Sequence, residues 1–389
     1  MDGLQWITVH QVQVSAGGEL TGMPGLMWRV IHHGIWVVYL GVVQAIISPE
    51  STGNVAWRTP MAVAATSWFI SQTLLFSSKK LSPTIRMASK AVHSSSQSIT
   101  PSSSPLKVVD SHLHVWASPQ EAAEKYPYFP GQEPSIPGDL DFLLKCMSEA
   151  GVDCALIVQP INHMFDHSLV TSVLKRQPSK FIGCCLANPA EDGSGLKQLE
   201  DLVLKDGYRA VRFNPYLWPS GQKMTNDLGK AMFSKAGELG IPVGIMCMKG
   251  LSLHISEIEE LCTTYPSTVV LLDHMAFCKP PVNDEEQETF SALLNFSRFP
   301  QVYVKFSALF RLSRKPYPYE DTGELLSQAI SSYGANRVMW GSDFPYVVPE
   351  CGYKEAKEAV SLIASQMHVS SSDLEWIMGR TAMQLFQHS

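Results

Sequence analysis

Two histidines stand one residue apart in the stretch VVDSHLHVW, residues 108–116. In a β-strand, side chains at positions i and i+2 point to the same face, so His112 and His114 would project side by side. A pair of imidazoles on one face suits a metal ion or a proton-transfer site. A lone strand-end histidine is more often a packed, hydrogen-bonded side chain, so the interpretation depends on what surrounds the pair.

Other polar side chains end later apolar runs of the chain. Polar groups in such runs cost free energy unless they find partners, so their recurrence indicates a shared site. A strand-end arginine such as Arg212 can instead pair with a barrel carboxylate, and Lys305 can bridge to an acid. The set comprises Gln159, Arg212, Asn214, Asp273, His274, Lys305, Ser307 and Asp343, with His163 and His167 in the loop after Gln159.

Eight short apolar runs, separated by helical patterns, must position these residues. Continuous β-branched runs are typical of parallel strands that are buried on both faces. Repeated alternation of strand and helix predicts a (β/α)8 TIM barrel, and the alternative, a doubly wound open sheet, lacks a G-x-G-x-x-G motif after its first strand. The expected strands are 107–115, 154–160, 181–189, 208–215, 241–248, 268–276, 301–309 and 337–345, and expected helices include 139–151, 169–178, 226–240, 254–266 and 370–386.

The barrel prediction places the chemistry at one end of the molecule. Active sites of such barrels lie at the C-terminal ends of the strands, and the first and last strands are neighbours. His112, His114 and Asp343 should therefore meet, and His274 should join them from the sixth strand.

The first hundred residues differ in composition from the rest. Residues 51–109 contain no acid, and 61–105 are rich in Ser, Thr and Ala with scattered Lys and Arg. That composition is typical of an organelle transit peptide, so we expect a disordered segment, removed on import into the chloroplast, with the mitochondrion as the alternative. The apolar run 34–47 is short for a membrane span, and 1–60 is an uncertain segment upstream of an internal start at Met61. The catalytic domain is expected over 106–389.

Charge and cysteine usage exclude two classes of function. Seven of the 30 basic and three of the 36 acidic residues lie in 1–109, which leaves 23 and 33 for 110–389. This acidic body argues against nucleic-acid binding. The eight cysteines form no C-x-x-C motif and most lie in apolar runs. We interpret Cys184, Cys185 and the methionines near 246 as core rather than as a disulfide framework or a site.

Four motifs in order, VVDSHLHVW, LLDHMAF, VYVKFSAL and WGSDFP, resemble the amidohydrolase-related family of TIM-barrel hydrolases over residues 106–387. The resemblance is strongest to the branch of sugar lactonases and 2-pyrone-4,6-dicarboxylate lactonase. It implies that Asp343 takes a proton from the attacking water. It also implies that His112, His114 and His274 polarise the carbonyl under attack or hold a divalent metal.

Two departures from the family pattern limit the metal content. Family members with two metals have a carboxylated lysine or a glutamate on strand 4 and a histidine on strand 5. Here strand 4 offers Arg212 and Asn214, and strand 5 reads GIMCMKG. A binuclear centre is therefore not expected. The pattern favours metal-independent catalysis, with a single Zn-type ion on His112, His114 and Asp343 as the rival.

The predicted function is hydrolysis of a lactone or similar cyclic ester that carries a carboxylate. Arg212 would bind the substrate carboxylate, Arg311 and Arg314 would clamp a second one, and Lys305 is a further candidate. Gln159 and Asn214 would orient the substrate.

Two alternative functions remain open. One is a metal-dependent nonoxidative decarboxylase of an aromatic or muconate-type acid, and the other is a non-catalytic binding barrel. The sequence predicts a small-molecule substrate and no stable membrane span, and it is compatible with a homo-oligomer. Tyr126, Tyr128 and Phe129, in the long loop 119–139, are candidates for a pocket wall or for packing on the barrel rim.

Overall fold

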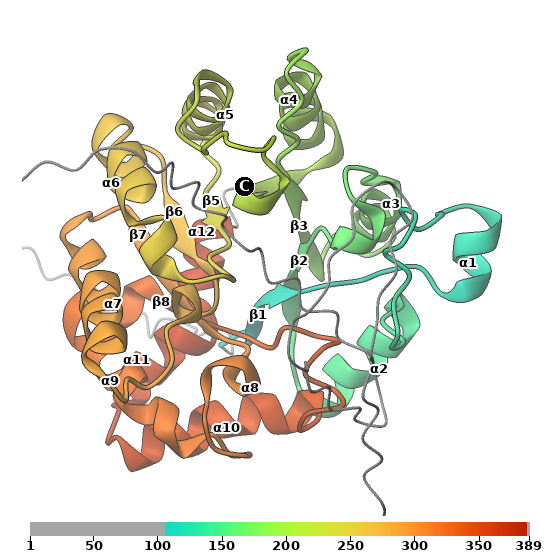
Figure 1. The fold of residues 1–389 in the computed structure, drawn as a ribbon. Helices are drawn as coiled ribbons and strands as arrows, with labels where there is room; N and C mark the ends of the chain where they lie inside the picture. Colours follow the sequence, from blue (N-terminus) through green and yellow to red (C-terminus); the bar gives the residue numbers. More distant parts are fainter. Residues whose placement is uncertain (1–105, 387–389) are drawn as a thin grey trace, which may run out of the picture. The chain divides into compact units, whose positions relative to one another are not determined.

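The computed structural model describes residues 106–386. Its eight strands form one parallel sheet in the order β1 to β8, surrounded by helices (Figure 1). The strands are β1 (Val109–Leu113), β2 (Cys154–Val158), β3 (Phe181–Leu186), β4 (Tyr208–Phe213), β5 (Val243–Ile245), β6 (Val270–Leu272), β7 (Val302–Ser307) and β8 (Val338–Gly341).

The last strand returns to the first. The Asp343 N–H donates to the carbonyl of His112 at 2.8 Å, and the His114 N–H donates to the carbonyl of Phe344 at 2.7 Å. The buried Asp110 carboxylate also links β1 to the segment after β8. It accepts hydrogen bonds from the Ser342 N–H at 2.9 Å and from the Tyr353 hydroxyl at 3.0 Å. The predicted TIM barrel is confirmed.

The helices begin and end where their sequences dictate. For α2, the Asp139 side chain accepts from the Phe142 N–H, and Gly151 closes the helix in the left-handed region at φ 62°. The helices are α1 (Pro119–Glu124), α2 (Leu140–Ala150), α3 (Ser168–Arg176), α4 (Ser194–Asp206), α5 (Asp227–Glu238), α6 (Ile255–Thr264), α7 (Asp284–Asn295), α8 (Leu309–Leu312), α9 (Gly323–Tyr333), α10 (Tyr353–Gln366), α11 (Ser371–Glu375) and α12 (Thr381–Phe386), with a π-helical turn over Trp376–Arg380.

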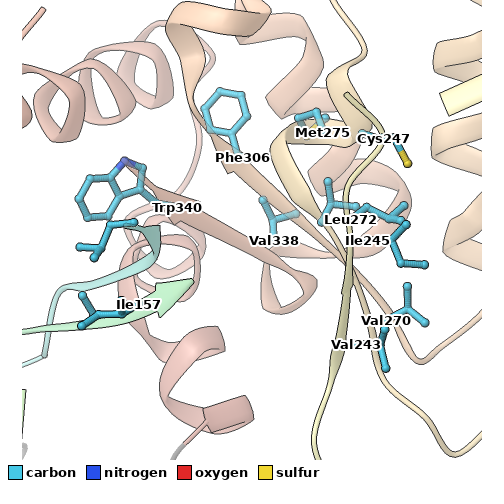
Figure 2. Packing of buried hydrophobic residues seen from close by; sticks show 14 of the residues in the cluster. Ile157, Val243, Ile245, Cys247, Val270, Leu272, Met275, Phe306, Val338 and Trp340 are labelled. Carbon is cyan, nitrogen blue, oxygen red and sulfur yellow. The ribbon is translucent and has the colours of Figure 1, made fainter. Parts of the chain in front are cut away.

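The strands are buried on both faces, as their continuous apolar runs predict. Val243, Ile245, Val270 and Leu272 face the helices (Figure 2). The alternate residue Leu271 belongs to a second cluster, which forms inside the barrel. That inner cluster also contains Val109, Cys154, Leu156, Val158, Cys184, Ala210, Met339, Ala382 and Phe386.

All eight cysteines are free, and Cys184 and Cys185 are buried, as expected. No helix within residues 106–386 is long and apolar enough to cross a membrane. The predictions for 1–60 and 61–105 lie outside the described residues.

Candidate active site

Three imidazoles surround one carboxylate oxygen where β1 meets β8. The Oδ1 atom of Asp343 lies 3.4 Å from Nε2 of His114 and 3.9 Å from Nε2 of both His112 and His274. All four side chains are buried. The structure therefore brings together the four residues predicted as catalytic, and their catalytic role stays a prediction.

Unusual backbone conformations aim two of these side chains. The chain leaves β6 through a left-handed turn in which His274, Met275 and Ala276 have φ of 50–52°. Asp343 is also left-handed, at φ 64°. Such conformations are costly for residues other than glycine and tend to occur at functional sites. At Gly341 a Cβ atom would lie 2.8 Å from the Cβ of His112, so only glycine lets β8 pass this close to β1.

In His114 and His274, one ring nitrogen is held by a hydrogen-bond partner from a neighbouring strand or loop. Nδ1 of His114 donates to the carbonyl of Val158 at 2.8 Å, and Nδ1 of His274 lies 2.8 Å from the Ser307 hydroxyl. In both rings Nε2 is left facing Asp343. Burial lowers the pKa of His274 to about 4 and that of His112 well below its usual value, so these two rings are neutral at pH 7.

Asp273 organises a buried charge cluster that the sequence prediction missed. Its Oδ1 atom is 3.0 Å from the Lys305 amine and 3.2 Å from Nδ1 of His112, and its Oδ2 atom is 3.0 Å from Nε of Arg212. Burial alone would raise the pKa of Asp273, but Lys305, His112 and Arg212 outweigh it and hold that pKa well below the usual range. The available signal was Lys305 itself, because a lysine inside an apolar strand requires an anion.

Arg311, on α8, pairs with the carboxylate at the centre of the site. Its Nε atom lies 2.7 Å from Oδ2 of Asp343, and its guanidinium stacks over the ring of Tyr346 at 4.9 Å. Burial opposes ionisation of Asp343, but His274, His114 and Arg311 outweigh it and lower its pKa. Asp343 is therefore a carboxylate at physiological pH.

A cavity of about 410 Å³ opens onto this cluster. That volume lies within the range of small-molecule sites. The sequence prediction missed Tyr216, Phe277 and Tyr346, which line it. The interpretation of the methionines near 246 as core is wrong, since Met246 is only partly buried, Met248 is half-exposed, and both line the cavity. The predicted residues among the lining are His114, Gln159, Arg212, Asn214, His274, Arg311 and Asp343.

Two predicted binding residues are partly occupied by the backbone. The Gln159 amide donates to the carbonyls of Met164 and Asp166, at 3.1 and 2.8 Å. The Asn214 side chain accepts from the Tyr216 N–H at 3.2 Å. Both still line the cavity, so a role in orienting a substrate stays a prediction.

Other candidates lie away from the cavity. Lys305 is buried on Asp273 and is not in the lining, so the structure gives it the bridging position that was the alternative to substrate binding. Arg314 binds Glu286 at 2.6 Å. The aromatic residues of the loop 119–139 are not in the lining either: Tyr126 is buried, the Tyr128 hydroxyl donates to the Ala117 carbonyl, and Phe129 is exposed.

The residues present fit a single divalent ion. His112, His114 and Asp343 each offer one ligand atom, and these atoms lie within 4.8 Å of one another. Metal–ligand bonds of 2.0–2.1 Å in tetrahedral geometry place ligand atoms about 3.3 Å apart, close to the 3.4 and 3.9 Å found here. Nε2 of His112 is buried and has no hydrogen-bond partner within residues 106–386. Asp273 at Nδ1 of this ring supplies the carboxylate partner that metal-binding histidines usually have.

Comparisons with known proteins identify the family of the chain. A 4-sulfomuconolactone hydrolase from Hydrogenophaga intermedia is 26% identical over 256 residues, which cover 64% of this chain and 76% of the relative. A structure described as a 2-pyrone-4,6-dicarboxylic acid hydrolase from Pseudomonas putida superposes with a TM-score of 0.60 at 23% identity, covering 72% of this chain and 97% of its own.

A 5-carboxyvanillate decarboxylase from Sphingomonas paucimobilis superposes with a TM-score of 0.54 at 14% identity, over 73% of this chain and all of its own. At these identities the two structures show the shared fold alone. The family model described as Amidohydrolase matches residues 109–387, a range that contains the whole barrel and every residue around Asp343. The chain belongs to the amidohydrolase family and is a hydrolase.

Proposed function

We propose that this protein hydrolyses an anionic lactone or a similar cyclic ester. The observation that carries the proposal is the ionised carboxylate of Asp343, which faces three imidazole Nε2 atoms at the end of a cavity that two arginines also line. The sulfomuconolactone hydrolase relative supports a lactone as the substrate class.

Asp343 would act as the general base. As the water oxygen bonds to the lactone carbonyl carbon, one water proton passes to the carboxylate. When the ring C–O bond breaks, the same proton passes to the departing ring oxygen. The immediate products are a hydroxyl and a carboxylic acid on one opened chain; one water is consumed, and the acid releases the second water proton to solvent to become a carboxylate.

His274 would stabilise charge on the carbonyl oxygen, whereas Nε2 of His114, whose Nδ1 donates to Val158, would accept from the attacking water beside Asp343. Donors fixed before the reaction starts are effective in stabilising that charge, because they need no reorganisation in the transition state. The Ser307 hydroxyl can accept from Nδ1 of His274 or donate to it, so this ring can present an Nε2–H donor. Nδ1 of His112 lies 3.2 Å from both the Asp273 carboxylate and the Lys305 amine, and its Nε2 atom is buried beside Asp343.

Arg212 and Arg311 would hold the anionic group of the substrate. The Nε atom of Arg212 pairs with Asp273, and that of Arg311 pairs with Asp343. Both arginines line the cavity. If one divalent ion were bound by His112, His114 and Asp343, it would polarise the carbonyl and lower the pKa of water.

The test is the substitution Asp343→Asn, assayed against a panel of carboxylated lactones. Loss of the base should lower kcat by about 10²–10⁴-fold. Far-ultraviolet circular dichroism and Tm should stay near those of the wild type. Asp201→Asn, on the exposed surface of α4, is the matched control and should keep full activity. Activity of Asp343→Asn within tenfold of the wild type would refute the assignment.

A second candidate, nonoxidative decarboxylation of an aromatic acid, is favoured by the three-ligand cluster, because such decarboxylation depends on a firmly bound metal. Exhaustive chelation separates the two candidates. We expect lactone hydrolysis to persist after chelation. Release of CO2 from an aromatic acid, abolished by chelation and restored by Zn²⁺, would favour the decarboxylase instead.

A further inference from the structure

The cavity has a charged side and an apolar side. His114, His274, Arg311 and Asp343, from the β1 and β6–β8 side of the barrel, make the charged side. Contiguous strands β2 to β5 and the segments that follow them contribute most of the apolar residues, together with the polar Gln159, Arg212 and Asn214. These apolar residues are Ile161, Leu186, Leu217, Met246 and Met248, joined by Phe277 from the turn after β6.

Two methionines of this apolar side line the cavity instead of packing in the core. Met246 and Met248 alternate with the buried Cys247 where β5 ends, so both thioethers are turned out of the core and into the cavity. Met248 is 50% exposed and lines the cavity. Methionine side chains adapt to irregular apolar ligands.

The charges at the site sum to a small value. Arg212, Arg311 and Lys305 are cations, and Asp273 and Asp343 are carboxylates that these cations keep ionised. For these five side chains, without the histidines and the buried Asp110, the balance is one positive charge. One anionic group on a ligand neutralises it, whereas a second would be buried without a matching cation.

Arg212 is the residue that can receive this anion. Its Nε atom is engaged by Asp273, and its terminal nitrogens make no hydrogen bond to any residue in 106–386. Arg212 also lies on β4, among the strands that contribute the apolar side. An anion on Arg212 therefore places the rest of the ligand between the apolar residues and Asp343.

We propose that the substrate is a lactone with one anionic group and an alkyl or aryl substituent, which packs on Met246, Met248 and Phe277. This inference rests on the proposed function and narrows it. The proposed substrate differs from the dicarboxylic acid named for the Pseudomonas putida structure, which carries two carboxylates.

The experiment compares synthetic butenolides of matched size that carry one carboxylate and either a phenyl, a butyl or a carboxyethyl group. Hydrolysis is followed by pH-stat titration. We expect kcat/KM for the phenyl and butyl compounds to exceed that for the dicarboxylate by at least tenfold. An equal or higher value for the dicarboxylate would overturn the inference.

Substitution of the apolar side should reverse this preference. Met246→Gln and Met248→Gln keep side-chain length but add an amide, and each should lower kcat/KM for the phenyl compound by about tenfold with little effect on the dicarboxylate. Leu253→Gln is the matched control, because Leu253 is 59% exposed after the same strand but does not line the cavity. An equal loss on both substrates would indicate general damage and contradict the assignment.

Calorimetric binding of the corresponding saturated cyclic ethers, which cannot be hydrolysed, separates this inference from the proposed function. Tighter binding of the phenyl ether than of the dicarboxylate, without turnover of any lactone, would refute the lactonase and retain the ligand class. Equal binding of the two ethers would refute the ligand class itself.

Discussion

The barrel contains two groups of buried histidines that look alike in sequence and differ in their partners. His163 and His167, which follow β2, have both ring nitrogens engaged by the backbone. Nδ1 of each faces a carbonyl, and Nε2 accepts from the N–H of Ala117 in one case and of Leu186 in the other. In His114 and His274 only Nδ1 is engaged within the barrel, and Nε2 faces a carboxylate.

This difference separates structure from chemistry. An imidazole held at both nitrogens by the backbone is a fixed neutral cross-link, with no lone pair or proton left for a ligand. An imidazole held at one nitrogen has a fixed orientation and a free partner atom. Burial, which both groups share, therefore does not identify a catalytic histidine, and the partner of the second nitrogen does.

The largest expected contrast is in turnover. His114→Gln removes an Nε2 acceptor that faces Asp343, and we expect kcat on the best lactone to fall by about 10²–10³-fold, as for loss of a group that orients the attacking water for the base. The same change at His167 should leave kcat unchanged, because that ring is not in the lining of the cavity. Steady-state kinetics of the two variants at 25 °C measure the contrast. Equal losses would show that the second nitrogen is not the criterion.

Lowering the pH should reduce the free energy of unfolding through the histidines that are held by the backbone, of which His167 is the clearest case. Burial lowers the pKa of His167 to about 4, from about 6.5 when unfolded, so the unfolded chain binds this proton first. Its contribution to stability is complete above pH 6.5 and is lost as the pH falls towards 4, by on the order of 3 kcal/mol.

Urea unfolding of the wild type and His167→Gln over this range isolates the effect. The wild type should lose stability relative to the variant as the pH falls. A constant difference between the two proteins from pH 7 to pH 4 would contradict the assignment of His167 as a buried neutral cross-link.

Much of the site could be predicted because the order of the strands along the chain determines which strands are neighbours in a closed barrel. Once eight strands were recognised, the ends of the first and last had to meet, and His112 and Asp343 do meet through the backbone itself. Asp273 is among the polar strand ends that the sequence singles out, but the sequence assigns it no role, because its neighbour His274 is the more obvious candidate. Its role emerges only from three partners on three other strands, His112, Arg212 and Lys305.

The fate of the loop residues could not be predicted in the same way. Met246 and Met248 read as core, since the three-residue strand β5 ends before them and nothing in the sequence marks that end. For the long loop with Tyr128 the sequence leaves two interpretations open, a pocket wall or packing on the barrel rim, because its aromatic content does not say which way the rings turn. Loop conformation depends on tertiary partners that are distant in sequence, whereas strand alternation is local.

The smallest expected effect concerns two arginines that the sequence treats as equals. Arg311 and Arg314 lie three residues apart after β7, but only Arg311 reaches Asp343 and the cavity. Arg314 extends to Glu286 on α7 and is partly exposed. Arg314→Ala should change kcat/KM by less than about twofold, and the free energy of unfolding by less than about 1 kcal/mol, because exposed ion pairs contribute little. Arg311→Ala, measured in the same assay, should raise KM strongly. If both variants raised KM alike, Arg314 would have to leave Glu286 and contact the bound ligand. The sequence-based prediction that Arg311 and Arg314 together bind a substrate carboxylate would then hold for the complex.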